Sequence, residues 1–296
     1  MPDPFDAVHA RLLELPVFFV GGMPRSGTTW MQQLLNAHPN VLCMGESRFF
    51  EDLIPNLYEM LKSYSQRRHD LVDTWGPGVN GLVGMHMGPI FKASFASLAG
   101  ANLGDKDVAD LVTVGEKTPD NITSLRRLWQ IYPEARVIHV IRDPRDGAVS
   151  GYIRFNTKLV RHISREDYIP SYCEQWRNRI LEARKLAEGH AFMEVRYEDL
   201  HADAENTAAK LFRFLGAPDD AETVAAAVQK ASFESLSGGR KRGETDARSH
   251  YRQGVVGGWR AELTETEQAA AIEAAEPVLS ELGYLEPEDR AASGEA

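Results

Sequence analysis

The residue types best suited to bind an anion gather in one short segment, Gly22–Trp30, whose sequence is GMPRSGTTW. Its two glycines have the Gly-x4-Gly spacing of a phosphate-binding P-loop, but Thr28 stands where that loop carries a lysine. The cation of this segment is Arg25, which lies inside the loop. We therefore predict an anion-binding loop without the lysine that reaches the β- and γ-phosphates of a nucleoside triphosphate.

The residues around this loop predict a strand before it and a helix after it. Residues 15–20 form an apolar run typical of a buried strand in a parallel sheet. Residues 28–37 place Trp30, Leu34 and Ala37 on one helical stripe. The N–H groups and the positive dipole end at the start of that helix would face a phosphate-like anion.

A second candidate anion site follows another predicted strand. The β-branched run 135–141 leads directly to Arg142, and the hydroxyl of Ser150 follows eight residues later on a predicted helix. Ligands of open α/β sheets bind beyond the carboxyl ends of the strands. Two such sites on one edge suggest a nucleotide with phosphate-like groups at both its 5′ and 3′ positions. Asp143 and Asp146, in a turn with Pro144, are interpreted as helix-start residues.

The rest of the chain predicts an α/β fold with a central parallel sheet flanked by helices, because strands and helices alternate. Further strands are expected over residues 41–44, 111–114 and 192–196, and helices over residues 1–14, 123–132, 168–188, 205–215 and 264–282. We expect one domain over residues 1–285, with residues 50–110 as a substrate-capping insertion and 286–296 as a polar tail. The glycine-rich stretch 75–89 is either a substrate-gating loop or a plain surface connection.

Composition limits the classes of function. The formal net charge of −10 argues against general binding of nucleic acid or of anionic membranes. Two cysteines, Cys43 and Cys173, imply no disulfide framework, and the Cys/His spacing supports no metal site. No apolar run approaches the roughly 18 residues of a membrane span. We therefore expect a cytoplasmic protein without a metal; the sequence carries no signature of its oligomeric state.

The two loops, in this order, resemble the PAPS-dependent sulfotransferase family (PAPS is 3′-phosphoadenosine 5′-phosphosulfate, and PAP is its desulfated product). Residues 24–30 are similar to the 5′-phosphosulfate loop of that family, and residues 141–150 to its 3′-phosphate motif. Residues 195–200 resemble its tyrosine-containing segment beside the adenine. Residues 251–254, with Gly258 and Trp259, resemble its C-terminal loop that closes on the donor. The resemblance covers residues 15–260 and implies a P-loop-like fold with PAPS as the sulfuryl donor.

The resemblance also implies which residues hold the donor. Those for the 5′-phosphosulfate would be Arg25, Ser26, Gly27, Thr28 and Thr29, beside Trp30, with Arg25 also near the bridging oxygen. Those for the 3′-phosphate would be Arg142 and Ser150, and the pocket would be completed by Tyr197, Ser249, Arg252, Gln253 and Gly254.

Catalysis of sulfuryl transfer needs a cation at the bridging oxygen and a base for the acceptor proton. The resemblance implies that Lys117 is the catalytic lysine; the alternative is a solvated lysine at the end of a strand. Small-molecule members carry a histidine two residues later, where this chain has Pro119. Residues 38–48 look instead like the tyrosylprotein and carbohydrate branches, in which a glutamate is the base, and this implies Glu46.

Other roles for these residues stay open. Glu46 could pair with Arg48 or cap the next helix, and His86 is a second candidate base. The predicted reaction is in-line transfer from PAPS to the hydroxyl of a tyrosine, a saccharide or a natural product. The alternatives are a P-loop small-molecule kinase, which would need Mg²⁺ and a lysine at position 28, and a non-catalytic nucleotide-binding protein.

Overall fold

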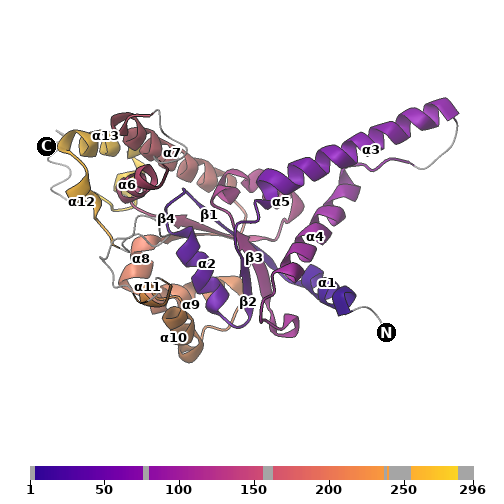
Figure 1. The fold of residues 1–296 in the computed structure, drawn as a ribbon, viewed down its shortest axis with the longest axis horizontal. Coiled ribbons are helices and arrows are strands. Elements are labelled where there is room, and N and C mark those ends of the chain that lie inside the picture. Colours follow the sequence, from indigo (N-terminus) through magenta and orange to yellow (C-terminus); the bar gives the residue numbers. More distant parts are fainter. Residues whose placement is uncertain (1–3, 76–79, 156–162, 237–238, 240–254, 286–296) are drawn as a thin grey trace.

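The computed structural model describes residues 4–75, 80–155, 163–236, 239 and 255–285. Its sheet has five strands in the order β2-β3-β1-β4-β5, and every neighbouring pair is parallel (Figure 1). The strands are β1 (Val17–Gly22), β2 (Val41–Met44), β3 (Thr113–Lys117), β4 (Arg136–Ile141) and β5 (Phe192–Arg196). The predicted α/β fold with a parallel sheet is confirmed.

Helices connect the strands, as parallel pairing requires. Before β3 come α1 (Pro4–Glu14), α2 (Thr28–Ala37), the π-helical turn Phe49–Leu53, α3 (Ile54–Trp75), α4 (Gly84–Ala101) and the 3₁₀ turn Val108–Asp110. Between β3 and β5 come the 3₁₀ turn Pro119–Thr123, α5 (Leu125–Ile131), α6 (Pro144–Phe155) and α7 (Arg165–Leu186). After β5 come α8 (Tyr197–Ala202), α9 (Ala204–Leu215), α10 (Ala221–Lys230), α11 (Phe233–Leu236), α12 (Trp259–Glu262), α13 (Glu265–Ala275) and α14 (Val278–Glu281).

Both faces of the sheet are covered, because successive residues of a buried strand point to opposite sides. Phe18 and Phe19 of β1 are both fully buried. Phe19 belongs to a core with residues of α1, α4 and α5, and its ring lies 5.4 Å from that of Phe95. Phe18 belongs to a second core with residues of α2, α9 and α10. A third core joins α6, α7, α12, α13 and α14.

Two expectations about helices are corrected. Residues 84–89, expected in a glycine-rich loop, begin α4, and Met87 is buried on that helix. Residues 264–282, expected as one helix, form α13 and α14. Of the proposed gating loop, residues 76–79 lie outside the described residues.

Figure 1 shows α3 extending away from the sheet, beyond the layer that α4 and α1 form. The helix has 22 residues, which corresponds to a length of about 33 Å. Apolar side chains on it, such as those of Met60 and Tyr64, are exposed. None of the helices described is long and apolar enough to cross a membrane.

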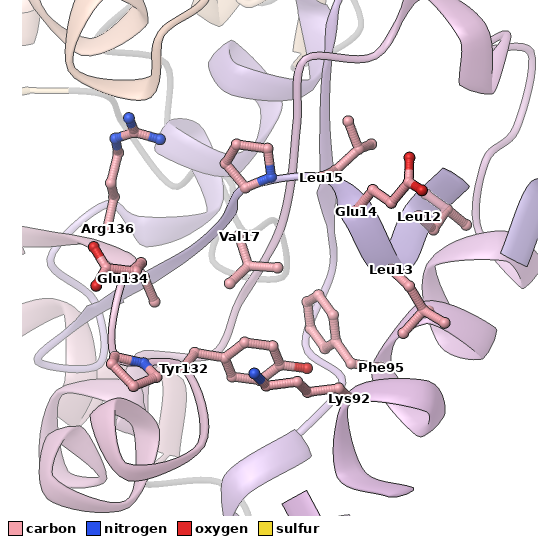
Figure 2. Close-up of a pocket in the computed structure, with 14 residues that line it drawn as sticks. Leu12, Leu13, Glu14, Leu15, Val17, Lys92, Phe95, Tyr132, Glu134 and Arg136 are labelled. Atoms are coloured by element: carbon pink, nitrogen blue, oxygen red, sulfur yellow. The ribbon is translucent and has the colours of Figure 1, made fainter. Parts of the chain in front are cut away.

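A cavity of about 370 Å³ lies at the opposite end of the sheet from the predicted anion-binding loops. It is lined by Val17 and Arg136, which begin β1 and β4, and by Lys92 and Phe95 of α4 (Figure 2). Since the loops follow the carboxyl ends of these same strands, this cavity is separate from the candidate site described next.

Candidate functional site

The carboxyl ends of three central strands bring the predicted site residues to one edge of the sheet. Val20 of β1 is in register with Lys117, the last residue of β3, and with Ile138 of β4. The loop after β1 therefore lies between Lys117 on one side and Arg142, which follows β4, on the other. This is the arrangement predicted for the two anion-binding loops.

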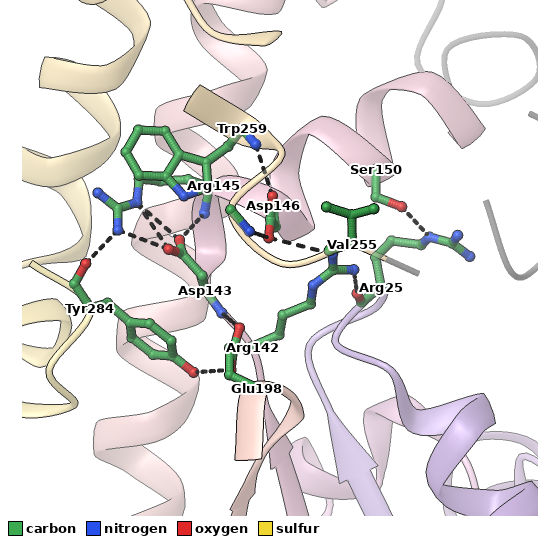
Figure 3. A network of polar contacts seen from close by, with 11 residues as sticks. Arg25, Arg142, Asp143, Arg145, Asp146, Ser150, Glu198, Val255, Trp259 and Tyr284 are labelled. Atoms are coloured by element: carbon green, nitrogen blue, oxygen red, sulfur yellow. Dashed lines mark hydrogen bonds and ion pairs between the residues drawn. The ribbon is translucent and has the colours of Figure 1, made fainter. Parts of the chain in front are cut away.

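Direct contacts join these two loops. The Nε atom of Arg25 donates a hydrogen bond to Oγ of Ser150 at 3.1 Å, across 125 residues of sequence. An Nη atom of Arg142 donates to the backbone oxygen of Arg25 at 3.4 Å (Figure 3). The two loops are therefore in direct contact through the side chains of Arg25 and Arg142.

The first loop has the backbone of an anion cradle. Gly27, with φ of 98°, is the residue before α2, and Arg25 also has a positive φ, of 76°. A Cβ atom on Gly27 would lie 2.5 Å from Cδ2 of Tyr197. Only glycine fits this position, because both the dihedral angle and the aromatic ring exclude a side chain. The Ser26 side chain is 1% exposed, and its Oγ has no hydrogen-bond partner.

The ring of Tyr197 contacts residues of both loops. Its ring contacts Gly27, lies edge-on to Trp30 with ring centroids 5.3 Å apart, and has the guanidinium of Arg142 4.5 Å from its centroid. The indole N–H of Trp30 donates to the backbone oxygen of Ala231 at 2.8 Å. These contacts fix the orientation of Arg142. Contact of Tyr197 with an adenine stays a prediction.

The second loop is held by two aspartates that act differently. Asp143 accepts hydrogen bonds from the backbone N–H and the guanidinium of Arg145, and the first of these is the helix-start contact expected. Asp146 also lies at the start of the helix, in the first turn of α6, but its carboxylate accepts hydrogen bonds from the backbone N–H groups of Gly257 and Trp259, at 2.8 and 2.9 Å. It also lies 3.5 Å from Arg142 (Figure 3).

Lys117 and Glu46 form an ion pair at the other side of the first loop. Nζ of Lys117 lies 2.5 Å from Oε1 of Glu46 and 3.4 Å from Oγ1 of Thr29. Lys117 is 4% exposed, so the alternative of a solvated lysine is wrong, whereas half of the Glu46 side chain is exposed. Arg48 pairs with Asp52 at 2.6 Å, so it is not the ionic partner of Glu46.

The sequence analysis overlooked Glu116, which immediately precedes Lys117 and is fully buried. Its carboxylate accepts hydrogen bonds from the backbone and side chain of Ser47, from Thr118 and from Asn121. Burial raises the pKa of this carboxyl group above its usual range, and the hydrogen bonds partly offset that effect. Glu116 therefore fixes the segment that carries Glu46. A glutamate inside a buried strand was the signal that could have identified it.

Several predicted site residues are not brought into this arrangement. Ser249, Arg252, Gln253 and Gly254 lie outside the described residues. His86 is exposed near the start of α4, where its Nδ1 accepts a hydrogen bond from the backbone N–H of Val83. Among the residues with described placement, no cluster of three or more His, Cys, Asp or Glu side chains could hold a metal ion.

Comparisons with known proteins show the family of this chain. Residues 16–221 match the profile of a protein family described as "Sulfotransferase family". The chain is 30% identical over 211 residues to protein-tyrosine sulfotransferase 1 of Danio rerio, covering 69% of this chain and 54% of that protein. It is 24% identical over 226 residues to the protein-tyrosine sulfotransferase of Drosophila melanogaster, covering 74% and 41%. The chain thus spans about half the length of these curated relatives, or less.

Solved structures share the fold over nearly the whole chain. Mouse sulfotransferase SULT7A1 complexed with PAP has a TM-score of 0.54 at 15% identity, covering 98% of this chain and 93% of that one. Retinol dehydratase in a complex with retinol and PAP has a TM-score of 0.52 at 17% identity, covering 96% and 88%. At these identities the likeness extends to the fold alone.

Proposed function

Because this chain belongs to the sulfotransferase family, we propose that it transfers a sulfuryl group from PAPS to a hydroxyl group of its acceptor. The observation that carries the proposal is the hydrogen bond from Arg25 Nε to Ser150 Oγ, which joins two anion-binding loops. A single nucleotide with phosphate-like groups at its 5′ and 3′ positions could contact both loops. The PAP complexes of structurally similar proteins support the same donor.

The described residues fit such an anionic nucleotide. The Oγ atom of Ser26 and the Nε atom of Arg142 are buried without hydrogen-bond partners, so each could bind an anion oxygen. Gly27 immediately precedes α2, where N–H groups of the first turn have no partner within the helix. The 5′-phosphosulfate would be held by Arg25, Ser26, Gly27, Thr28 and Thr29, and the 3′-phosphate by Arg142 and Ser150. Trp30 and Tyr197 would complete the pocket, with Ser249, Arg252, Gln253 and Gly254 as further predicted contacts.

The residues of this chain contribute charge and position. When bound, PAPS supplies an activated sulfuryl group and a stable leaving nucleotide. Lys117 and Arg25 would offset negative charge at the reacting end of the pocket, which is where preorganised cations have their largest effect. Neither side chain needs to move far, since both are already held by hydrogen bonds to Thr29 and Ser150.

We further propose Glu46 as the base that accepts the proton of the acceptor hydroxyl. Its carboxylate lies 2.5 Å from Lys117 and is half exposed, so an acceptor arriving from solvent can reach it. The acceptor class we propose is the hydroxyl of a tyrosine, a saccharide or a natural product. Similarity to proteins named protein-tyrosine sulfotransferases supports the first of these.

Calorimetric titration with PAP and with ATP–Mg²⁺ tests the donor. We expect tight binding of PAP in the presence of a chelator and weak binding of ATP–Mg²⁺, because position 28 lacks the lysine of a P-loop kinase. Preference for ATP–Mg²⁺ would overturn the proposal in favour of a small-molecule kinase. Incubation of an acceptor library with PAPS, followed by mass spectrometry for the gain of one SO₃ unit, then identifies the acceptor.

A further inference from the structure

Asp146 lies between the cation that would bind the 3′-phosphate and the backbone of the C-terminal segment Val255–Trp259. Its two carboxylate oxygens accept separate hydrogen bonds, Oδ2 from the backbone N–H of Gly257 and Oδ1 from that of Trp259. Oδ2 also lies 3.5 Å from Nη2 of Arg142, which itself donates to the backbone oxygen of Val255 at 3.0 Å (Figure 3). The buried carboxylate of Asp146 thus contacts Arg142 and also the backbone N–H groups of Gly257 and Trp259.

The backbone of the segment is shaped for this contact. Gly257 has a φ of 75°, in the left-handed region that favours glycine. A Cβ atom there would lie 3.2 Å from Nη1 of Arg260, which is tighter than an ordinary contact. The turn that points the N–H groups of Gly257 and Trp259 at Asp146 is therefore specified by the sequence of the segment itself.

Trp259, the last residue of the segment, and the helices after it have anchoring contacts that do not involve Asp146. The indole ring of Trp259 stacks on the guanidinium of Arg145, 3.7 Å from the ring centroid. Arg145, which is fully buried, also donates to the backbone oxygen of Tyr284 at 2.6 Å. Loss of Asp146 would therefore release the backbone at residues 255–258 and leave Trp259 and the helices α12, α13 and α14 in place.

We propose that Asp146 is a positioning residue: its carboxylate holds the segment Val255–Trp259 against Arg142, and loss of this carboxylate weakens nucleotide binding because the segment detaches from Arg142. The inference rests on the proposed function, since it takes PAP as the nucleotide that Arg142 binds. Coupling is reciprocal: a nucleotide that favours the seated segment must bind more weakly when the segment is detached. Asp146 itself does not touch the nucleotide in this scheme.

The variant Asp146→Asn removes the charge facing Arg142 and replaces one of the two acceptor oxygens with a donor. One backbone N–H of the turn then faces an amide N–H instead of an acceptor. By calorimetry we expect the Kd for PAP to rise about tenfold or more. The matched control is Asp220→Asn, which removes a comparable side-chain acceptor at the start of α10 and should leave the PAP Kd unchanged.

Hydrogen exchange of the peptide that contains Gly257 and Trp259 provides the second readout. In the wild type we expect these amides to be protected without PAP and further protected with it, whereas in Asp146→Asn they should exchange faster in both states. Equal exchange without nucleotide, or an unchanged Kd for PAP, would overturn the role of Asp146. If the wild type does not bind PAP, the proposed function fails, and the exchange measured without nucleotide still decides the anchoring.

A double-mutant cycle separates positioning from general destabilisation. If Asp146 acts through Arg142, the change Asp146→Asn should raise the PAP Kd much less in an Arg142→Gln background than in the wild type. Additive effects would contradict the proposal. Should Asp146→Asn fail to fold, Gly257→Ala disturbs the same contact from the other side, and an unchanged PAP Kd for that variant would equally overturn the inference.

Discussion

The proposed donor side of the site, which contains Asp146, Ser150 and Tyr197, differs in burial from the proposed acceptor side, which contains Glu46. On the donor side, Asp146, Ser150 and Tyr197 are buried, and each contacts a segment distant in the sequence. On the proposed acceptor side, half of the Glu46 side chain is exposed. We expect α3, which extends away from the sheet, to belong to this side as well (Figure 1). The proposed donor side is thus largely preorganised by the fold, whereas Glu46 on the proposed acceptor side is accessible from solvent.

This difference indicates which part of the reaction the fold itself specifies. Preorganised contacts suit a donor that is always the same molecule, because they lower the entropic cost of binding it. We expect acceptor choice to depend on exposed apolar side chains such as those on α3, which can change without disturbing the proposed donor side. The following experiments test whether the two sides are separable.

Glu46→Gln should separate the two sides most clearly. We expect kcat to fall about 1,000-fold because the acceptor proton loses its base, while the Kd for PAP stays as in the wild type. Unchanged kcat across pH would remove Glu46 as the base. Asp52→Asn, at the exposed ion pair with Arg48, is the matched control and should retain turnover.

Lys117→Ala and Arg25→Ala should each reduce kcat about 100-fold, because each removes a positioned cation near the reacting end of the pocket. Circular dichroism and thermal unfolding should show that both variants retain the fold. Lys92→Ala, at the cavity on the opposite end of the sheet, is the control for loss of a lysine. Turnover like that of the wild type in both site variants would contradict the assigned roles.

Gly27→Ala tests the rigidity of the donor side. The new Cβ would meet Tyr197 at 2.5 Å, and the residue would keep a φ near 98°, so we expect a loss of about 2 kcal/mol in the free energy of unfolding together with weaker PAP binding. Gly45→Ala is the control, since nothing lies within 4 Å of a Cβ there. Equal stability of the two variants would mean that this loop is more adaptable than its contacts indicate.

The buried side chain of His139, in β4, should make the stability of the protein depend on pH. Burial lowers the pKa of His139 to about 3, so between about pH 6.5 and 3 the unfolded chain binds a proton that the native chain does not. This residue should therefore make the free energy of unfolding fall by about 1.4 kcal/mol for each pH unit lowered within that window. Denaturant titrations of the wild type and of His139→Met should show a smaller decline in the variant. Parallel profiles would contradict this assignment.

Met60→Ser should have the smallest effect. Met60 on α3 is 59% exposed, so the free energy of unfolding should change by about 0.5 kcal/mol or less, and the Kd for PAP should not change. The KM for an identified acceptor is the informative measurement. An altered affinity for PAP would show that α3 and the donor side are not independent.

Much of the fold could be predicted from local sequence. Strand β5 has the predicted bounds, and β4 begins one residue later than predicted. For β4 the reason is that an apolar, β-branched run buried on both faces of a sheet leaves few alternatives. Residues 84–89 could not be predicted in this way. Their glycines and Pro89 indicate a loop, but burial of Met87 and of Phe91 on the same helix overrides that local preference.

The candidate site divides along the same line. Arg25 and Arg142 could be identified because each follows a strand, and Lys117 because it lies at the end of one, since strand ends of a parallel sheet meet at one edge. The contacts of Glu116 with Ser47 and of Asp146 with Gly257 could not be predicted, because these partners lie 69 and 111 residues away in the sequence. A carboxylate that accepts backbone N–H groups from such distant segments leaves no periodic pattern.

Arg145 stacks on Trp259 and donates a hydrogen bond to the backbone of Tyr284, and these two contacts have a consequence for folding during translation. During translation the sheet strands emerge first, but Arg145 and Asp146 lack these partners until residues 257–259, and then Tyr284, have left the ribosome. A nascent chain could therefore form its five strands early and still be unable to retain a nucleotide. Ribosome-bound chains ending shortly before and shortly after this point should differ abruptly in nucleotide capture.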